Sequence, residues 1–296
     1  MHMMTTILGG FLGMGCGQNT ESLNSQPASN STNSDIVATV AAQPVVEEQP
    51  KSNAFALPTE EDLSAQPNAT QIRRGRELVM NTKQLLPNNV GDHLKCTNCH
   101  LQGGTVPNAM TFVGVVDRFP QYRSRSATTE SLAYRVNSCF ERSMNGVALE
   151  EQSQEMQDII AYMTWVSSKV ADGKNLHEKG VKKLEPLEPN LENGASVYAQ
   201  KCASCHQMTG QGVVVENNII YPPLWGEHSF NIGAGMARLD TAAAFVKWNM
   251  PFGQGGTLSD QEAYDVAAYF SQQVRPDYAK KDQDWPKGEK PRDARY

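Results

Sequence analysis

Two short stretches of the chain carry residues that could bind a cofactor covalently. Both have the spacing C-x-x-C-H, which comprises Cys96, Cys99 and His100 in KCTNCHLQ and Cys202, Cys205 and His206 in KCASCHQM. Two cysteines at this spacing can bond to the two vinyl groups of one haem, while the adjacent imidazole ligates the iron. The pair of motifs therefore predicts two covalently attached haem c groups, with His100 and His206 as iron ligands.

A zinc site and a redox-active C-x-x-C are the alternative interpretations. A structural zinc ion needs four ligands closing on one metal, whereas each triplet here lies in its own repeat unit. A thioredoxin-like redox motif lies in a βαβ setting, and the sequence shows no such pattern. Haem attachment is the prediction that remains, and it implies export to an oxidising compartment.

The second haem needs a sixth ligand if it only transfers electrons, and methionine is common in that position. Met208 is too close to the motif to reach the opposite face of the haem, and Met236 lies in a glycine-rich segment. Met250 is followed by Pro251, which would hold the loop across the haem edge. We therefore expect Met250 to ligate this iron, the alternative being a core methionine.

The iron of the first haem has two candidates for its sixth ligand. Met144 follows His100 by the same 44 residues that separate Met250 from His206. Cys139 lies five residues earlier and is the one cysteine of the folded part that no motif uses. A free cysteine is more often a small buried hydrophobe than a reactive group. Cys139 therefore has three open roles at this point: iron ligand, reactive thiol or buried core residue.

Arginines surround Cys139 in the sequence. On a helix, Arg135 would lie one turn before it and Arg142 nearly one turn after it, and Arg123 and Arg125 belong to the preceding loop. Cationic neighbours lower the pKa of a thiol, and guanidinium groups suit anions with several oxygens. A solvated arginine-rich helix face is the alternative. Beside a haem, the cluster predicts an anion pocket.

An internal repeat positions these residues. The segment SQEMQDIIAYMTWV (153–166) matches SDQEAYDVAAYFSQQV (259–274), and IRRGRELV before the first motif matches LENGASVY before the second. Each unit is expected to form helix, motif, long loop, helix, helix, with Ser259 and Glu262 as a capping box. No segment shows sustained alternation. The predicted fold is therefore mainly α, with two tandem cytochrome c-like haem domains.

Composition divides the chain into six parts. They are an export or lipoprotein-like leader (1–16), a disordered linker (17–57), the domain of the first haem (58–170), an interdomain linker (171–190), the domain of the second haem (191–275) and a C-terminal extension (276–296). The leader ends at Cys16, which is a candidate for lipid attachment. The extension is too polar for a core, although Trp285 can pin it to the surface.

Charge and hydropathy exclude some partners. The net charge of -6 and pI near 5.6 argue against a protein that binds nucleic acid or anionic lipid. No run of 18 or more apolar residues occurs, so no membrane-spanning helix is expected.

The sequence resembles the thiosulfate dehydrogenase family of diheme cytochromes c, which is related to the haem-bearing A subunit of the Sox sulfur-oxidising complex. The resemblance covers roughly residues 60–296 and is carried by YRSRS, RVNSCFERSMNG, both haem motifs, NMP and DWPKGEKPRDARY. It implies that Cys139, not Met144, is the axial ligand of the first haem, and that Arg125 and Arg135 bind substrate there. Some relatives have a lysine before the methionine of the second haem; Asn249 stands in that place here.

The function implied is the joining of two thiosulfates into tetrathionate, with release of two electrons, or the reverse reaction. Cys139 would bond the outer sulfur of one thiosulfate, and Arg125, Arg135 and Arg142 would offset the repulsion between two dianions. The second haem would pass electrons to an external cytochrome in the periplasm. A diheme electron carrier without a substrate, and a Sox-type enzyme acting on a carrier-bound thiol, are the alternatives.

Overall fold

The computed structural model describes residues 57–91, 93–169 and 180–296 of the chain. The expected leader with Cys16, and all but the last residue of the expected linker 17–57, lie outside these described residues. All of these described residues belong to one compact unit. No helix within the described ranges is both long and apolar enough to cross a membrane.

Helices dominate the described residues, in agreement with the mainly α prediction. The helical elements of the first half are α1 (Glu60–Ser64), α2 (Ala69–Met80), α3 (Thr82–Leu85), η1 (Cys96–Asn98), α4 (Leu101–Gly104), η2 (Val116–Arg118), α5 (Leu132–Ser138), the π-helix η3 (Cys139–Ser143) and α6 (Gln154–Val166). Those of the second half are α7 (Leu191–Lys201), α8 (Ala203–His206), η4 (Gly235–Ala237), α9 (Leu239–Asn249), α10 (Asp260–Ser271) and η5 (Lys281–Gln283).

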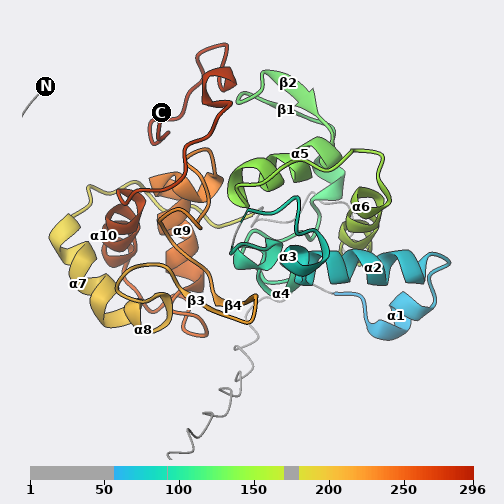
Figure 1. Ribbon diagram of the computed structural model, residues 1–296, viewed down its shortest axis with the longest axis horizontal. Coiled ribbons are helices and arrows are strands. Elements are labelled where there is room, and N and C mark those ends of the chain that lie inside the picture. The colour runs from blue at the N-terminus through green and yellow to red at the C-terminus, as the bar shows by residue number, and fades with distance from the viewer. Residues whose placement is uncertain (1–56, 92, 170–179) are drawn as a thin grey trace, which may run out of the picture. The chain divides into compact units, whose positions relative to one another are not determined.

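Each half is built on a close crossing of its first and last long helices. Helix α2 packs on α6, and α7 packs on α10 (Figure 1). A Cβ atom at Gly75 would lie 1.9 Å from the carbonyl oxygen of Asp158, and one at Gly194 would lie 2.1 Å from that of Asp265. Only glycine allows the backbones to approach so closely. The repeated glycine explains why IRRGRELV and LENGASVY match.

The ends of the crossing helices follow sequence signals. Ser153 accepts a hydrogen bond from Met156 N at the start of α6. At the start of α10, Ser259 Oγ accepts from Glu262 N at 3.1 Å and the Glu262 side chain accepts from Ser259 N at 2.7 Å. The predicted capping box is therefore confirmed.

The two hydrophobic cores lie mainly one in each half, although Phe230, Ala234 and Ala237 of the second half belong to the first core, and a small cluster also joins the halves. Leu78, Phe140 and Met156 are among the most buried side chains of the first core, and Tyr198 and Tyr264 of the second. The joining cluster consists of Leu101 and Ala109 of the first half and Phe245 of the second, with four partly buried residues packed on it, namely Val106, Met110, Met236 and Met250. The two halves thus share an apolar contact.

The long loops after the haem motifs contain two short hairpins that the sequence did not predict. Strand β1 (Gln121–Arg123) pairs antiparallel with β2 (Thr128–Glu130), and β3 (Val213–Val215) pairs antiparallel with β4 (Asn218–Tyr221). Strands of three or four residues are too short to show alternation in the sequence.

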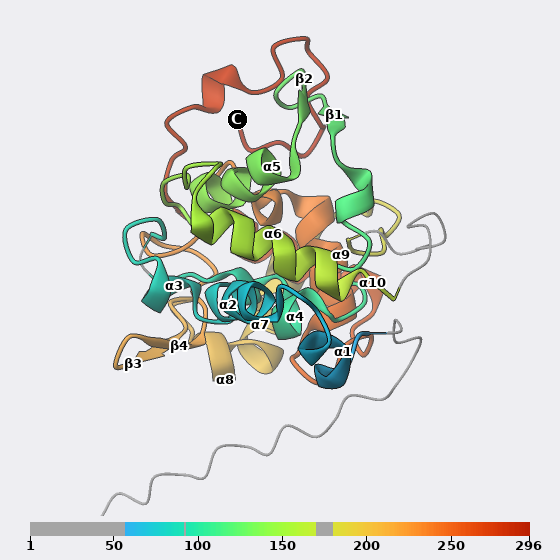
Figure 2. The same cartoon turned by 90° about the vertical axis from the view of Figure 1, so that its right-hand side faces the viewer.

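The C-terminal extension runs from the second half to the first. Figures 1 and 2 show this red segment passing from the region of α10 toward the hairpin β1–β2. Trp285 is 7% exposed and its backbone N–H donates to Arg125 O at 2.7 Å. Asp293 accepts from Arg238 Nε at 2.8 Å and from Asp240 N, at the start of α9, at 3.1 Å. The extension therefore contacts both halves.

Candidate functional site

Both cysteine-histidine motifs open into one cavity of about 650 Å³. Its walls are mostly apolar and include Leu101, Phe112 and Phe140 of the first half together with Phe245 and Phe270 of the second. The six motif residues that the sequence singled out all line it: Cys96, Cys99, His100, Cys202, Cys205 and His206. The structure therefore brings each triplet to the wall of an apolar hollow, which is what a porphyrin needs.

Both motif histidines are oriented by a backbone carbonyl. His100 Nδ1 lies 2.5 Å from Met110 O, and His206 Nδ1 lies 3.0 Å from Pro222 O. A carbonyl oxygen can only accept, so Nδ1 donates to it, and Nε2 is the nitrogen left for a metal or for another hydrogen bond. Burial also lowers the pKa of His206, which favours the neutral ring.

The four motif thiols fit covalent attachment of haem. All of them are free and half-buried. Burial raises the pKa of Cys96 to about 11, that of Cys99 to about 12 and that of Cys202 to about 11. Within the described part of the chain, no three His, Cys, Asp or Glu side chains are grouped as a metal ion would require. Two thiols and one imidazole at each motif are the side chains that covalent haem c attachment uses.

Cys139 faces the first motif across the cavity. It begins the π-helix η3 directly after α5, where Met144 N donates to Cys139 O at 2.9 Å. Arg135 Nη1 donates to the Cys139 sulfur at 3.3 Å, and the His100 ring is a second hydrogen-bond partner of the thiol. Burial acts to raise the pKa of Cys139, but Arg135 and His100 outweigh it and lower that pKa to about 6.

The expectation that Arg142 flanks the Cys139 sulfur is wrong. Arg142 Nη2 donates to Asp284 Oδ1 at 2.6 Å, and its guanidinium lies 4.4 Å from the centre of the Tyr278 ring. A π-helix spreads one turn over more residues than an α-helix, so side chains three positions apart no longer share a face. Arg142 therefore contacts the C-terminal extension instead of the cavity.

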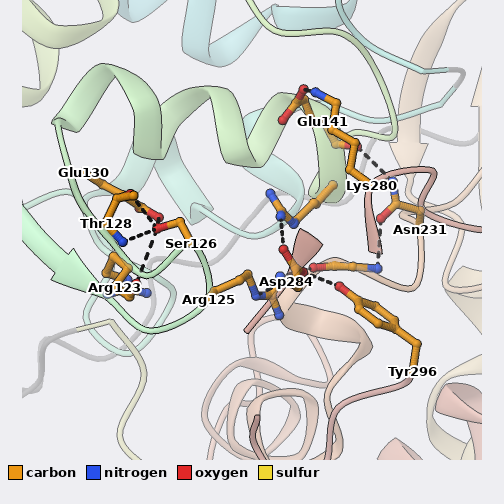
Figure 3. Close-up of polar contacts among 12 residues, drawn as sticks. Arg123, Arg125, Ser126, Thr128, Glu130, Glu141, Asn231, Lys280, Asp284 and Tyr296 are labelled. Atoms are coloured by element: carbon orange, nitrogen blue, oxygen red, sulfur yellow. Dashed lines mark hydrogen bonds and ion pairs between the residues drawn. The ribbon is translucent and has the colours of Figure 1, made fainter. Parts of the chain in front are cut away.

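Arg125 is also engaged with the extension. Its Nε lies 3.6 Å from Asp284 Oδ2, its Nη1 donates to Gly233 O at 2.5 Å, and its guanidinium stacks on Trp285 at 4.6 Å. Figure 3 shows the Arg125 side chain directed toward Asp284 and away from Arg123. Neither Arg125 nor Arg142 is among the residues that line the cavity.

Two further arginines line the cavity together with Arg135. They are Arg118 at the end of η2 and Arg123 at the end of β1, and no described carboxylate forms an ion pair with either. Burial first, and then the charges of Arg123 and Arg135, lower the pKa of Arg118. Arg118 directly precedes the loop that contains Arg123 and Arg125, but it was not among the arginines predicted from the sequence. Three guanidinium groups without carboxylate partners make this part of the cavity suited to an anion.

The four candidate methionines differ in burial and in the core that each contacts. Met208 is 61% exposed, and Met144 is 3% exposed within the first core, although it also touches the cavity. Met250 caps the end of α9, packs against the second core and lines the cavity that His206 enters. Met236 lines it too, but packs against the first core. Met250 therefore remains the predicted partner of the second haem.

Asn249 is committed to structural hydrogen bonds. Its side-chain amide donates to Asn108 O of the first half at 2.9 Å and to Phe245 O at 3.0 Å, and the residue is 3% exposed. An amide offers no basic amine that could replace Met250 on an iron. The structure thus gives Asn249 a role in joining the two halves.

Comparison with known families agrees with this two-site geometry. Residues 88–171 match the family described as SoxA/TsdA, cytochrome c domain, and residues 189–270 match cytochrome C oxidase, cbb3-type, subunit III. Each half of the chain is therefore a cytochrome c domain, and the protein carries two covalently bound haem c groups.

Full-length relatives decide the family. A thiosulfate dehydrogenase from Psychrobacter arcticus is 41% identical over 274 residues, which cover 92% of this chain and 82% of the relative. The chain belongs to the thiosulfate dehydrogenase family. A second member, from Allochromatium vinosum, is 40% identical over 77% of this chain and 87% of its own.

A solved member of the thiosulfate dehydrogenase family has the same fold. It is the thiosulfate dehydrogenase (TsdBA) from Marichromatium purpuratum in its as-isolated form, with a TM-score of 0.71 and 33% sequence identity. The match covers 75% of this chain and 50% of the solved one, so this chain spans half of that longer protein.

Proposed function

We propose that the protein interconverts thiosulfate and tetrathionate at the cavity wall between Cys139 and His100. The observation that carries the proposal is the position of Cys139: its thiol faces a haem-motif histidine and accepts a hydrogen bond from Arg135. The names of the relatives supply the substrates, and the arginine-lined cavity supports them because thiosulfate and tetrathionate are dianions.

The residues present fit two haem groups. Cys96, Cys99, His100 and Cys139 would hold the first haem. Cys202, Cys205, His206 and Met250 would hold the second. When bound, the two haems supply the electron chemistry, each accepting one of the two electrons that the oxidation releases.

The chain's own residues account for the sulfur chemistry. The Cys139 thiolate bonds to the outer sulfur of one thiosulfate, and two electrons leave, which gives a cysteine S-thiosulfonate. The outer sulfur of a second thiosulfate then attacks the outer sulfur of that adduct. The new S–S bond completes tetrathionate, and the Cys139 thiolate leaves. The reverse sequence reduces tetrathionate with the same atoms.

Arginine side chains make this encounter of dianions feasible. Arg135 lies against the reacting sulfur, and Arg118 and Arg123 line the same cavity, so substrate sulfonate oxygens have guanidinium donors within it. Arg125 and Arg142 contact Asp284 of the C-terminal extension and do not line the cavity, so they support the site indirectly. Electrons leave to an external cytochrome, and the protein works in the periplasm, where haem c is attached.

A Cys139→Gly variant tests the proposal. We expect it to keep both haems and to lose both thiosulfate oxidation and tetrathionate reduction, together with the spectroscopic signature of a thiolate-ligated ferric haem. Met144→Leu is the matched control, because Met144 is the other sequence candidate for the first iron and should tolerate an apolar replacement. Full activity of Cys139→Gly would exclude Cys139 as the reacting thiol and refute the proposed site. If the isolated wild-type chain failed to oxidise free thiosulfate, a carrier-bound thiol would be the better substrate.

A further inference from the structure

The turn that begins at Cys139 is held from outside its own domain. The carbonyl oxygens of Glu141 and Arg142 lie at the end of the π-helix, where a helix leaves carbonyls without internal partners. Asn231 of the second half donates to both: its side-chain amide donates to Glu141 O at 2.8 Å, and its backbone N–H donates at 3.2 Å to Arg142 O, which also accepts from Asn145 N at 3.3 Å. The turn is therefore fixed against the second domain.

The C-terminal extension fixes the side chains of the same turn. Asp284 is the centre of these contacts and its side chain is only 4% exposed. It accepts hydrogen bonds from Arg142 Nη2 at 2.6 Å and from the Tyr296 hydroxyl, and Arg125 Nε lies 3.6 Å away. Lys280 of the extension also pairs with Glu141. Figure 3 shows Arg125 and Tyr296 converging on Asp284, with Lys280 beside Glu141.

The position of Cys139 depends on this arrangement because the turn is a π-helix. A π-helix is less favourable than an α-helix and persists where surrounding contacts hold it. If Arg142 lost Asp284, its buried guanidinium would have to reach water or another acceptor, and the turn could relax toward α-helical geometry. Such a change would rotate the Cys139 sulfur relative to Arg135 and His100. A small displacement of a reacting atom is costly in an active site.

We propose that Asp284 is a positioning residue for Cys139, acting through Arg142 with Arg125 and Tyr296 as its other partners. This inference rests on the proposed function, because it concerns the thiol that the proposal places at the reacting centre. Asp284 touches neither the cavity nor Cys139. Its role is to keep the π-helical turn in the one conformation that presents the sulfur to the first haem site.

An Asp284→Asn variant tests the inference, with Asp293→Asn as its matched control. Asp293 belongs to the same extension and is similarly buried, at 5% side-chain exposure, but it holds Arg238 and the start of α9 instead of the Cys139 turn. We expect Asp284→Asn to lower kcat/KM for thiosulfate by about 10- to 100-fold. It should also alter the electron paramagnetic resonance signature of the thiolate-ligated haem. Asp293→Asn should leave that signature unchanged.

Two outcomes overturn the inference. One is a wild-type signature and wild-type rate in Asp284→Asn; the other is an equal change in Asp293→Asn, which would indicate a general stabilising role of the extension. A double-mutant cycle adds a second criterion. If Asp284 acts through Arg142, the variant carrying both Asp284→Asn and Arg142→Gln loses no more activity than the more damaged single variant, whereas additive losses contradict the mechanism.

A milder variant covers the case in which Asp284→Asn does not fold. Tyr296→Phe removes one hydrogen bond to Asp284 and leaves both arginines paired, so we expect the same spectral change at smaller amplitude. An unchanged signature in Tyr296→Phe would then count against the inference. The two proposals remain distinguishable. An active Cys139→Gly protein refutes the proposed function, whereas an inactive Cys139→Gly protein beside an unchanged Asp284→Asn protein refutes only the positioning role.

Discussion

Replacing Arg135 by glutamine should reduce catalysis without disturbing either haem domain. Arg135 Nη1 donates to the Cys139 sulfur at 3.3 Å, and the side chain lies in the cavity wall. A point-charge interaction at that distance and an effective dielectric constant of about 20 would be about 5 kcal/mol, which is an upper figure for a half-buried site. Hydrogen bonds to charged groups contribute about 1.5–3 kcal/mol. The expected loss in kcat/KM is therefore about 10- to 150-fold.

The assay should follow thiosulfate oxidation with one fixed electron acceptor and tetrathionate reduction with one fixed donor. Both rates should fall, because both directions pass through the same Cys139 adduct. Arg135→Lys restores the charge but not the planar fork, so we expect it to recover part of the loss. Arg73→Gln provides a control of the same residue type, since Arg73 is on the surface and pairs with Glu60.

Two results would refute this reasoning. The first is an Arg135→Gln enzyme whose kcat/KM stays within about twofold of wild type, since that is far below the tenfold expected from 1.4 kcal/mol. The second is an Arg135→Gln loss that Arg73→Gln reproduces, which would indicate a nonspecific effect of net charge.

Three further predictions concern the haems and the helix crossings. Both haems should stay with the chain after denaturation and treatment with a chelator, as measured by mass spectrometry; loss of either mass would contradict thioether attachment. Met250→His should lower the reduction potential of the second haem in a spectroscopic redox titration, because methionine ligation raises it, and an unchanged potential would assign the ligand elsewhere. Gly75→Ala and Gly194→Ala should each destabilise their own domain by at least about 1–3 kcal/mol through overpacking. Thermal unfolding followed at each haem checks this, and wild-type stability in either variant would contradict the close helix crossing.

Sequence alone predicted the features that local chemistry fixes. The C-x-x-C-H spacing identified both triplets, and the structure places all six residues on one cavity. The repeat predicted the helical segments that form α2, α6, α7 and α10, because the segments of one half match those of the other; the close crossings at Gly75 and Gly194 were not predicted. The capping box at Ser259 depends on residues three positions apart, so it too was visible.

What sequence could not predict depends on partners distant in the chain. Arg142 was expected beside Cys139 because an α-helix would place it there, but the turn is π-helical and Asp284 lies 142 residues further along. Asp284 lies in a polar tail, and no feature of the neighbouring sequence indicates that its carboxylate is buried against two arginines. Arg118 was missed as well, since only the folded loop brings it to the cavity.

The apolar cluster between the two halves has a consequence for the speed of turnover. Leu101 and Ala109 pack in one cluster with Phe245, and Asn249 ties α9 to Asn108, so packed side chains hold the two halves together around the cavity that both cysteine-histidine motifs line. Packed interiors resist deformation. The two motifs therefore keep a fixed separation, and electron transfer between them needs no hinge motion. Internal charge transfer in this protein should therefore be indifferent to solvent viscosity, and glycerol or sucrose should slow only the encounters with sulfur anions and with the redox partner.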